Sequence, residues 1–245
     1  MTNKSDALPV SYPSARFKPR TIPHVLQPQS LLLSHLPIEV RLQIWLHVIG
    51  NQKIHIINKY RRLGHAVMDD EYWCQYHAER PSLRACSWMY TYGALPTTKQ
   101  LADDTLCHVL VTCRQIYHEA VALLYSTNTF AFWDLRTIAV FKHCIPFRSW
   151  QSIRSVEVYA MSYRKDDIAD AVEARSLLQL EAWPDACAAL ASMPNLRNLK
   201  VRLANPQYLD KQYLMGQRVN TREAVRSFVR EIKVKTQLEV ILMGI

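Results

Sequence analysis

LPIEVRLQIW, at residues 36–45, and LVTCRQIYHEA, at residues 110–120, decide the fold of this chain. The first stretch predicts an amphipathic helix over residues 37–49. The proline at its start suits the first turn, because its missing N–H would find no partner within the helix there. Glu39 follows where the helix dipole favours a negative charge. Gly50 ends the helix, and apolar residues recur along it at helical spacing, at Val40, Ile44, Trp45, Val48 and Ile49.

The second stretch predicts one long helix that begins at Asp103 or Asp104 and reaches Tyr125. Either aspartate can cap its N-terminus. A wide apolar stripe, which indicates a helix central to packing, runs along it at Leu106, Val109, Leu110, Cys113, Ile116, Tyr117, Ala120, Leu123 and Leu124. The polar residues at 126–128 then break the helix.

Beyond residue 128 strands alternate with helices, which predicts an α/β sheet with mainly parallel pairing through right-handed crossovers. The strands are expected at 129–133, 153–158, 196–203 and 238–242. The helices are expected at 135–145, at 166–193 with an interruption at Trp183-Pro184, and at 220–235. Ile153, Leu196 and Leu238, which start three of the strands, are 43 and 42 residues apart. A stack similar to leucine-rich repeats and an ordinary small α/β sheet both fit this spacing.

We therefore expect an α+β or α/β protein in three parts. A basic, proline-rich tail covers residues 1–30. A helical module covers 31–125, with an insertion at 51–104 that contains short strands at 53–57 and 83–89. An α/β domain covers 126–245.

The composition fits a globular protein with a basic surface. Hydrophobic residues make up 49% of the 245 residues, and the formal net charge is +9. That charge permits nucleic acid, acidic lipid or acidic protein as a partner. The six cysteines are scattered, no secretory signal is visible, and no apolar run approaches the roughly 20 residues that span a bilayer. We expect an intracellular location, cytoplasmic or nuclear, without membrane attachment.

Patterns that carry chemistry are weak in this sequence. Cys74 and His77 have the spacing of a zinc-ligand pair, but zinc needs four ligands and a second close pair does not follow. Cys113 and His118 lie five residues apart, so they do not share a helix face as a nucleophile and its base would. With five glycines, the chain has no phosphate-binding loop. We expect no enzyme activity, no cofactor and no metal.

One basic pattern remains, which enters and runs along the predicted C-terminal helix. Four arginines recur every fourth residue, at Arg218, Arg222, Arg226 and Arg230. This stripe could contact phosphates or acidic protein. It fits a solvated helix face better, because Glu223 and Glu231 interrupt it and successive exposed aromatics are missing.

The two deciding stretches together resemble the F-box, and more closely a large class of uncharacterised fungal F-box-like proteins. In that class, a Leu-Pro-x-Glu-Val-Arg-x-x-Ile-Trp helix precedes a variable insertion. A Thr-Cys-Arg-Gln-Ile-Tyr-x-Glu-Ala helix follows, and a Leu-Tyr-Ser-x-Asn-Thr-Phe turn ends it. Residues 124–130 supply this ending.

The resemblance implies a protein–protein interaction adaptor. F-box proteins bind the adaptor subunit of a cullin ubiquitin ligase and present a substrate through a C-terminal domain. Here the insertion at 51–104 splits the module, unlike the compact F-box. The positions that match partner-binding or helix-organising residues are Leu36, Pro37, Ile38, Val40, Ile44, Leu110, Cys113 and Ile116.

Two other functions remain open. The basic tail and the arginine stripe would serve a nucleic-acid or acidic-surface binder, with nucleic acid the less favoured partner. The F-box-like helices would otherwise be wholly internal, since apolar residues at helical spacing usually face inward. Exposure of Leu36, Ile38 and Val40 distinguishes a docking surface from a core.

Overall fold

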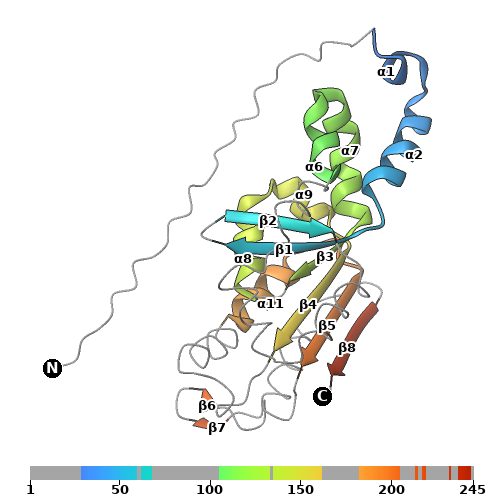
Figure 1. Cartoon of the computed structure of the whole chain (residues 1–245). Coiled ribbons are helices and arrows are strands. Elements are labelled where there is room, and N and C mark those ends of the chain that lie inside the picture. The colour runs from blue at the N-terminus through green and yellow to red at the C-terminus, as the bar shows by residue number, and fades with distance from the viewer. Residues whose placement is uncertain are drawn as a thin grey trace, which may run out of the picture.

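The computed structural model describes residues 29–59, 62–67, 105–132, 135–161, 182–204, 213–214, 217–218, 232 and 237–243. The predicted strand at 83–89, the predicted helix at 220–235 except residue 232, and almost all of the predicted tail lie outside these residues. So do Cys74, His77 and Asp103-Asp104. The described elements form a helical lobe at one end of a twisted sheet (Figure 1).

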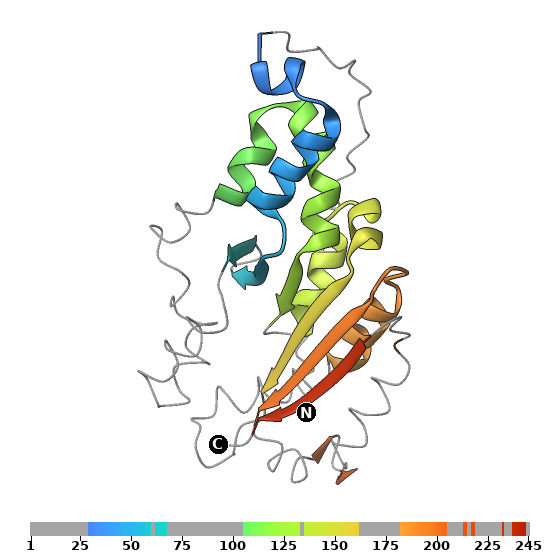
Figure 2. The same cartoon turned by 90° about the vertical axis from the view of Figure 1, so that its right-hand side faces the viewer.

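Among the described residues, the helical lobe contains four helices: α1 (Leu31–His35), α2 (Ile38–Ile49), α6 (Thr105–Thr112) and α7 (Arg114–Thr127). The helix predicted at 37–49 is present, with Pro37 at its N-cap. Figure 2 shows α2 and α7 side by side above the sheet. Two segments more than 60 residues apart in the chain therefore fold together.

The prediction of one continuous helix up to Tyr125 is wrong, because Cys113 separates α6 from α7. Its backbone is extended, with φ −157° and ψ 162°. Its Sγ accepts a hydrogen bond from the N–H of Ile116 at 3.4 Å, so the thiol caps α7. Side-chain capping satisfies N–H groups that the first turn of a helix leaves without partners. The apolar periodicity continues across this break, and periodicity alone therefore did not reveal it.

The six-stranded sheet has the order β2-β1-β3-β4-β5-β8. β1 and β2 are antiparallel, and all other pairs are parallel. This arrangement confirms the predicted α/β class with a mainly parallel sheet. The strands are β1 (Lys53–Lys59), β2 (Arg62–Val67), β3 (Thr129–Phe132), β4 (Ser155–Met161), β5 (Asn198–Ala204) and β8 (Gln237–Met243). A small hairpin, β6 (Tyr213–Leu214) and β7 (Gln217–Arg218), forms a second sheet.

The four parallel strands after α7 lie in chain order, but their spacing is not constant. Thr129 pairs with Ser155, Ser155 with Asn198, and Asn198 with Gln237. These offsets are 26, 43 and 39 residues, so the fixed period of a leucine-rich repeat is absent from this pairing. β1 belongs to the predicted insertion yet pairs with β3. The insertion thus contributes to the same sheet as the C-terminal part.

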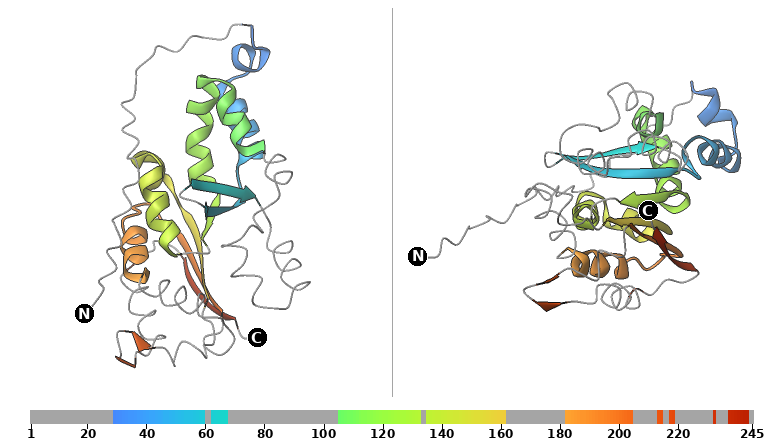
Figure 3. Two further views of the ribbon diagram at one scale, coloured as in Figure 1. Left: turned by 60° about the vertical axis from the view of Figure 1, so that its left-hand side comes forward. Right: turned by 60° about the horizontal axis from the view of Figure 1, so that its bottom comes forward.

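One face of the sheet is apolar and packs against α8 (Leu135–Cys144), with α11 (Trp183–Ala191) beside it (Figure 3). The Trp183-Pro184 pair begins α11, as proline at the start of a helix allows, and the predicted helical residues 166–181 lie outside the described residues. α9 (Phe147–Ser152) joins α8 to β4. The strand side chains of this face are buried: Ile54, Ile56, Phe130, Phe132, Val156, Val158, Leu199 and Val201.

The opposite face carries a buried carboxylate in the central strand β4. Glu157 is 2% exposed. Lys53 of β1 places its Nζ 2.6 Å from Glu157 Oε2, and Arg202 of β5 donates from Nε to Oε1. Burial acts to raise the pKa of Glu157, but the bonds from Lys53 and Arg202 outweigh burial and lower the pKa below its ordinary value. The ion triad ties β1 to β5 across the intervening strands.

Candidate docking site

A buried ion pair joins α2 to α7. Arg41 donates from Nε to Glu119 Oε2 at 3.0 Å and from Nη2 to Oε1 at 2.7 Å. The Arg41 side chain is 10% exposed and that of Glu119 is 8% exposed. A bidentate arginine–carboxylate pair fixes orientation as well as distance. The pair therefore sets the rotation of α2 against α7.

Arg41 and Glu119 also form hydrogen bonds with other groups. Arg41 Nη1 donates to the carbonyl oxygens of Leu33 at 3.3 Å and Leu36 at 2.6 Å. Glu119 also accepts from Trp45 Nε1 at 3.1 Å and from Gln115 Nε2 at 3.1 Å. We call this group of Arg41, Trp45, Gln115 and Glu119 the clamp. It holds α1, the turn after α1, α2 and α7 in one arrangement.

The clamp keeps both of its charges at neutral pH. The hydrogen bond from Arg41 lowers the pKa of Glu119, against the raising effect of burial. The hydrogen bond to Glu119 raises the pKa of Arg41. The pair is thus a charged unit inside an otherwise apolar helix contact, which is stable only while both partners are present.

A second junction fixes the ends of α2 and α7 nearest the sheet. Asn128, which is fully buried, donates from Nδ2 to the carbonyls of Ile49 at 2.7 Å and Leu124 at 2.8 Å. Its Oδ1 accepts from the backbone N–H of Gln52 at 2.7 Å. The N–H of Thr129 in turn donates to the carbonyl of Gln52 at 2.9 Å. Both helices therefore lead into their strands, β1 and β3, from one fixed point.

Gly50 allows the close approach of the two helix ends. A Cβ at this position would lie 2.6 Å from the carbonyl oxygen of Leu46 and 2.9 Å from Thr127 Oγ1. The left-handed backbone belongs to the next residue, Asn51, with φ 57°. The stop predicted at Gly50 is therefore present, and the glycine is needed there for space.

The predicted partner-binding residues fall into two groups. Ile38 is 45% exposed and Val40 is 44% exposed, and Pro37 is exposed as well. Leu36 and Ile44 are half-buried. In the other stretch, Leu110 and Ile116 are buried and Cys113 is half-buried. The structure thus leaves the start of α2 accessible, and it places the α6–α7 positions in or beside the core.

Sequence reasoning missed the clamp and the two most exposed apolar residues of the helical lobe, Leu31 and Val111. Leu31, in α1, is 73% exposed, and Val111, at the end of α6, is 77% exposed. The apolar run at 31–33 was a signal for α1. The clamp was signalled by charged residues inside apolar helical patterns, namely Arg41 and Glu119.

Arg218 lies in β7, and the other arginines of the predicted stripe lie outside the described residues. Across the described ranges, three or more His, Cys, Asp or Glu side chains nowhere gather in a way that could hold a metal ion. Across the same ranges, every helix is too short or too polar to cross a membrane.

These observations define a class: an α/β protein whose mainly parallel sheet carries a clamped helical lobe with an accessible apolar helix start. The chain belongs to the family of a domain of unknown function, DUF7730, whose model matches residues 25–242. That match includes both the lobe and the sheet, so they are parts of one family domain. No curated protein and no solved structure matches the chain.

Proposed function

We propose that the chain is a non-enzymatic protein–protein interaction adaptor of the F-box type, whose helical lobe docks a partner protein inside the cell. One observation carries the proposal. Ile38 and Val40 are nearly half exposed at the start of a helix that the clamp holds rigidly. Exposed apolar residues on a fixed helix are the usual anchors of helix-in-groove recognition.

The buried stripe of α2 supports this reading. Arg41, Trp45 and Ile49 face α7 and are buried. Val40, Ile44 and Val48 form a second stripe, which starts exposed and becomes half-buried toward the sheet. A helix that only completed the core would bury its whole apolar stripe. In α2 the charged Arg41 is buried instead, and Val40 of the apolar stripe is exposed. The apolar residues left over are available to a partner.

The clamp also lowers the cost of binding. Docking costs free energy when loops and side chains must become ordered on association. Arg41 already fixes the carbonyls of Leu33 and Leu36, and so it orders the turn that presents Ile38. The leading candidate for the partner is the adaptor subunit of a cullin ubiquitin ligase, with the sheet domain available to a substrate protein. The support for that choice is the likeness of the two helix stretches to the F-box.

The test is co-purification of the full chain with the cullin adaptor subunit. We expect wild-type chain to retain the adaptor and the double variant Ile38→Asp/Val40→Asp to lose it. Val67→Asp is the matched control, because Val67 is a 40% exposed apolar residue on β2, outside the lobe. Thermal melting checks that each variant folds.

Two outcomes contradict the proposal. If wild-type chain does not bind the adaptor, the ligase role is wrong. If the double variant binds as well as wild type, the start of α2 is not the docking surface. A wholly structural role for the lobe would then be the better account.

A further inference from the structure

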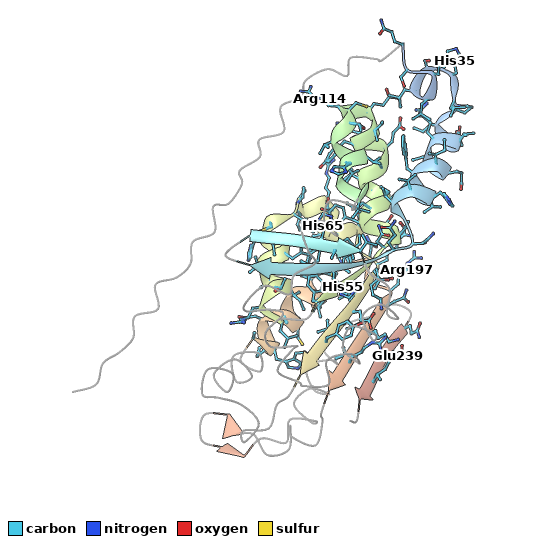
Figure 4. The ribbon with its side chains drawn as sticks, in the orientation of Figure 1. His35, His55, His65, Arg114, Arg197 and Glu239 are labelled. Atoms are coloured by element: carbon cyan, nitrogen blue, oxygen red, sulfur yellow. The ribbon has the colours of Figure 1, made fainter. Side chains whose placement is uncertain are left out.

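The end of the sheet nearest the helical lobe carries a group of exposed arginines. Arg154 directly precedes β4 and Arg197 directly precedes β5. Arg148 lies on α9, which leads into β4. All three residues are exposed, and we call them the basic edge. Figure 4 shows Arg197 at this end of the sheet, well away from Arg114 at the far tip of α7.

Backbone bonds hold the basic edge together. The N–H of Arg197 donates to the carbonyl of Arg154 at 2.8 Å. The next residues, Ser155 and Asn198, are register partners in the parallel pair. Arg154 and Arg197 therefore occupy neighbouring positions at this end of the sheet, with their strands about 4.8 Å apart. Two like charges held this close repel each other.

α9 is fixed to the same edge. Its Trp150 is 1% exposed and donates from Nε1 to Ser192 Oγ at 3.1 Å. Asn195 Nδ2 donates to the carbonyl of Gln151 at 2.9 Å. Arg148 and the exposed Phe147 lie on the free side of this anchored helix.

Among the described residues, ion pairs do not offset this charge. Neither the segment 135–154 nor the segment 186–197 contains an aspartate or a glutamate. The ion pairs between described residues are Arg41–Glu119, Lys53–Glu157, Lys200–Glu239 and Arg202–Glu157, so none of them includes an arginine of the basic edge. A surface that holds like charges together, without ion-pair partners among the described residues, fits an anionic partner.

We propose that the basic edge, together with Phe147, binds an acidic segment of a partner protein that carries apolar side chains. The forked guanidinium groups pair with carboxylates bidentately. Arginine and aromatic residues together are enriched in the energetic centres of protein–protein interfaces. Readers of single-stranded nucleic acid stack successive bases on several aromatics, and Phe147 is the only large exposed aromatic among the described residues of α9 and the two strand starts. The proposal goes beyond the docking role of α2 and does not depend on it.

The test measures binding of a labelled glutamate-rich peptide that contains leucines, with the glutamine version of the peptide as the neutral probe. We expect the full chain to bind the acidic peptide, to bind the neutral one weakly, and to lose affinity as salt rises. Arg148→Glu/Arg154→Glu/Arg197→Glu should weaken binding about tenfold or more, because each reversal replaces attraction with repulsion. Phe147→Ala should weaken it about threefold or more, since an exposed anchor is lost.

Arg114→Glu is the matched control, because it reverses an exposed arginine of α7 far from the basic edge. It should keep the affinity of wild type. If the triple variant does not fold, Arg154→Gln/Arg197→Gln is measured instead, with a loss of about threefold expected from the two missing charges.

Three results would overturn the proposal. One is the absence of acidic-peptide binding by the wild-type chain. Another is an equal loss of affinity in Arg114→Glu and in the triple variant, which would mean that overall charge and not this edge is responsible. The third is tighter binding of single-stranded RNA or of anionic vesicles than of the peptide, which would assign the edge to a different class of partner.

Discussion

Arg41 and Glu119 lie 78 positions apart in the chain and form a bidentate ion pair with N–O distances of 3.0 and 2.7 Å. The pair closes a loop that contains the whole insertion. It brings the two halves of the helical lobe together regardless of what lies between them. Two stretches of sequence separated in this way can therefore act as one unit.

Loss of one partner of this ion pair should destabilise the fold. Glu119→Gln leaves Arg41 charged and buried without a counter-ion, so we expect a loss of about 3 kcal/mol in the free energy of unfolding. Urea denaturation of the full chain measures this loss. Glu39→Gln is the control, because Glu39 is exposed in the first turn of α2 and its removal should cost less than about 1 kcal/mol. Equal losses in the two variants would show that the ion pair has no special role.

Stability should fall in acid because of Glu119 and Glu157. Both carboxyl groups have pKa values lowered in the folded state. They therefore contribute stability at neutral pH, above the unfolded-state pKa of about 4.3. As pH falls below that value toward the folded-state values, the unfolded chain takes up protons first and the contribution is lost. Urea unfolding between neutral pH and pH 3 measures the slope, and Glu157→Gln should make it shallower. A stability that stays constant over this range contradicts the prediction.

The close contact at Gly50 should not tolerate a side chain. Gly50→Ala places a methyl group against backbone and Thr127, so we expect a loss of about 1–3 kcal/mol from overpacking. Gly64→Ala is the matched control, because an added Cβ at Gly64 meets no atom within 4 Å. Thermal melting of the two variants compares them. The prediction is wrong if Gly50→Ala melts with wild type.

Because the Cys113 thiol caps α7, replacing it by alanine and replacing it by serine should have different effects on stability. Cys113→Ala removes the Sγ acceptor and should cost about 1 kcal/mol, whereas Cys113→Ser supplies a better capping oxygen and should retain most of the stability. A residue that served only as apolar packing would show the reverse order, because alanine keeps the apolar character that serine lacks. Urea denaturation of both variants decides between the two roles.

Much of the fold could be predicted from local patterns. Helical spacing located α2, and alternation of strands and helices predicted a mainly parallel sheet. β4, β5 and β8 begin within two residues of their predicted starts. β2 was missed, since its residues give no clear strand pattern and its stability comes from pairing with β1.

The candidate site was less predictable. Partner-binding positions were assigned in both stretches, yet Ile38 and Val40 of the first stretch are exposed while Leu110 and Ile116 of the second are buried. Periodicity shows that a helix has an apolar face, and it does not show how much of that face a neighbour covers. The neighbour of α2 is α7, and its position depends on Glu119.

The sequence by itself determined where most of the described helices and strands form, because hydrophobic periodicity and capping residues act over a few neighbouring positions. Only the tertiary structure decided which residues of α2 are buried and which remain accessible. Burial of Arg41 is favourable because Glu119 of α7 pairs with it. With Arg41 turned toward α7, the neighbouring Val40 remains exposed to solvent. The neighbouring positions of Arg154 and Arg197 likewise follow from strand pairing, which joins residues that are far apart in the chain.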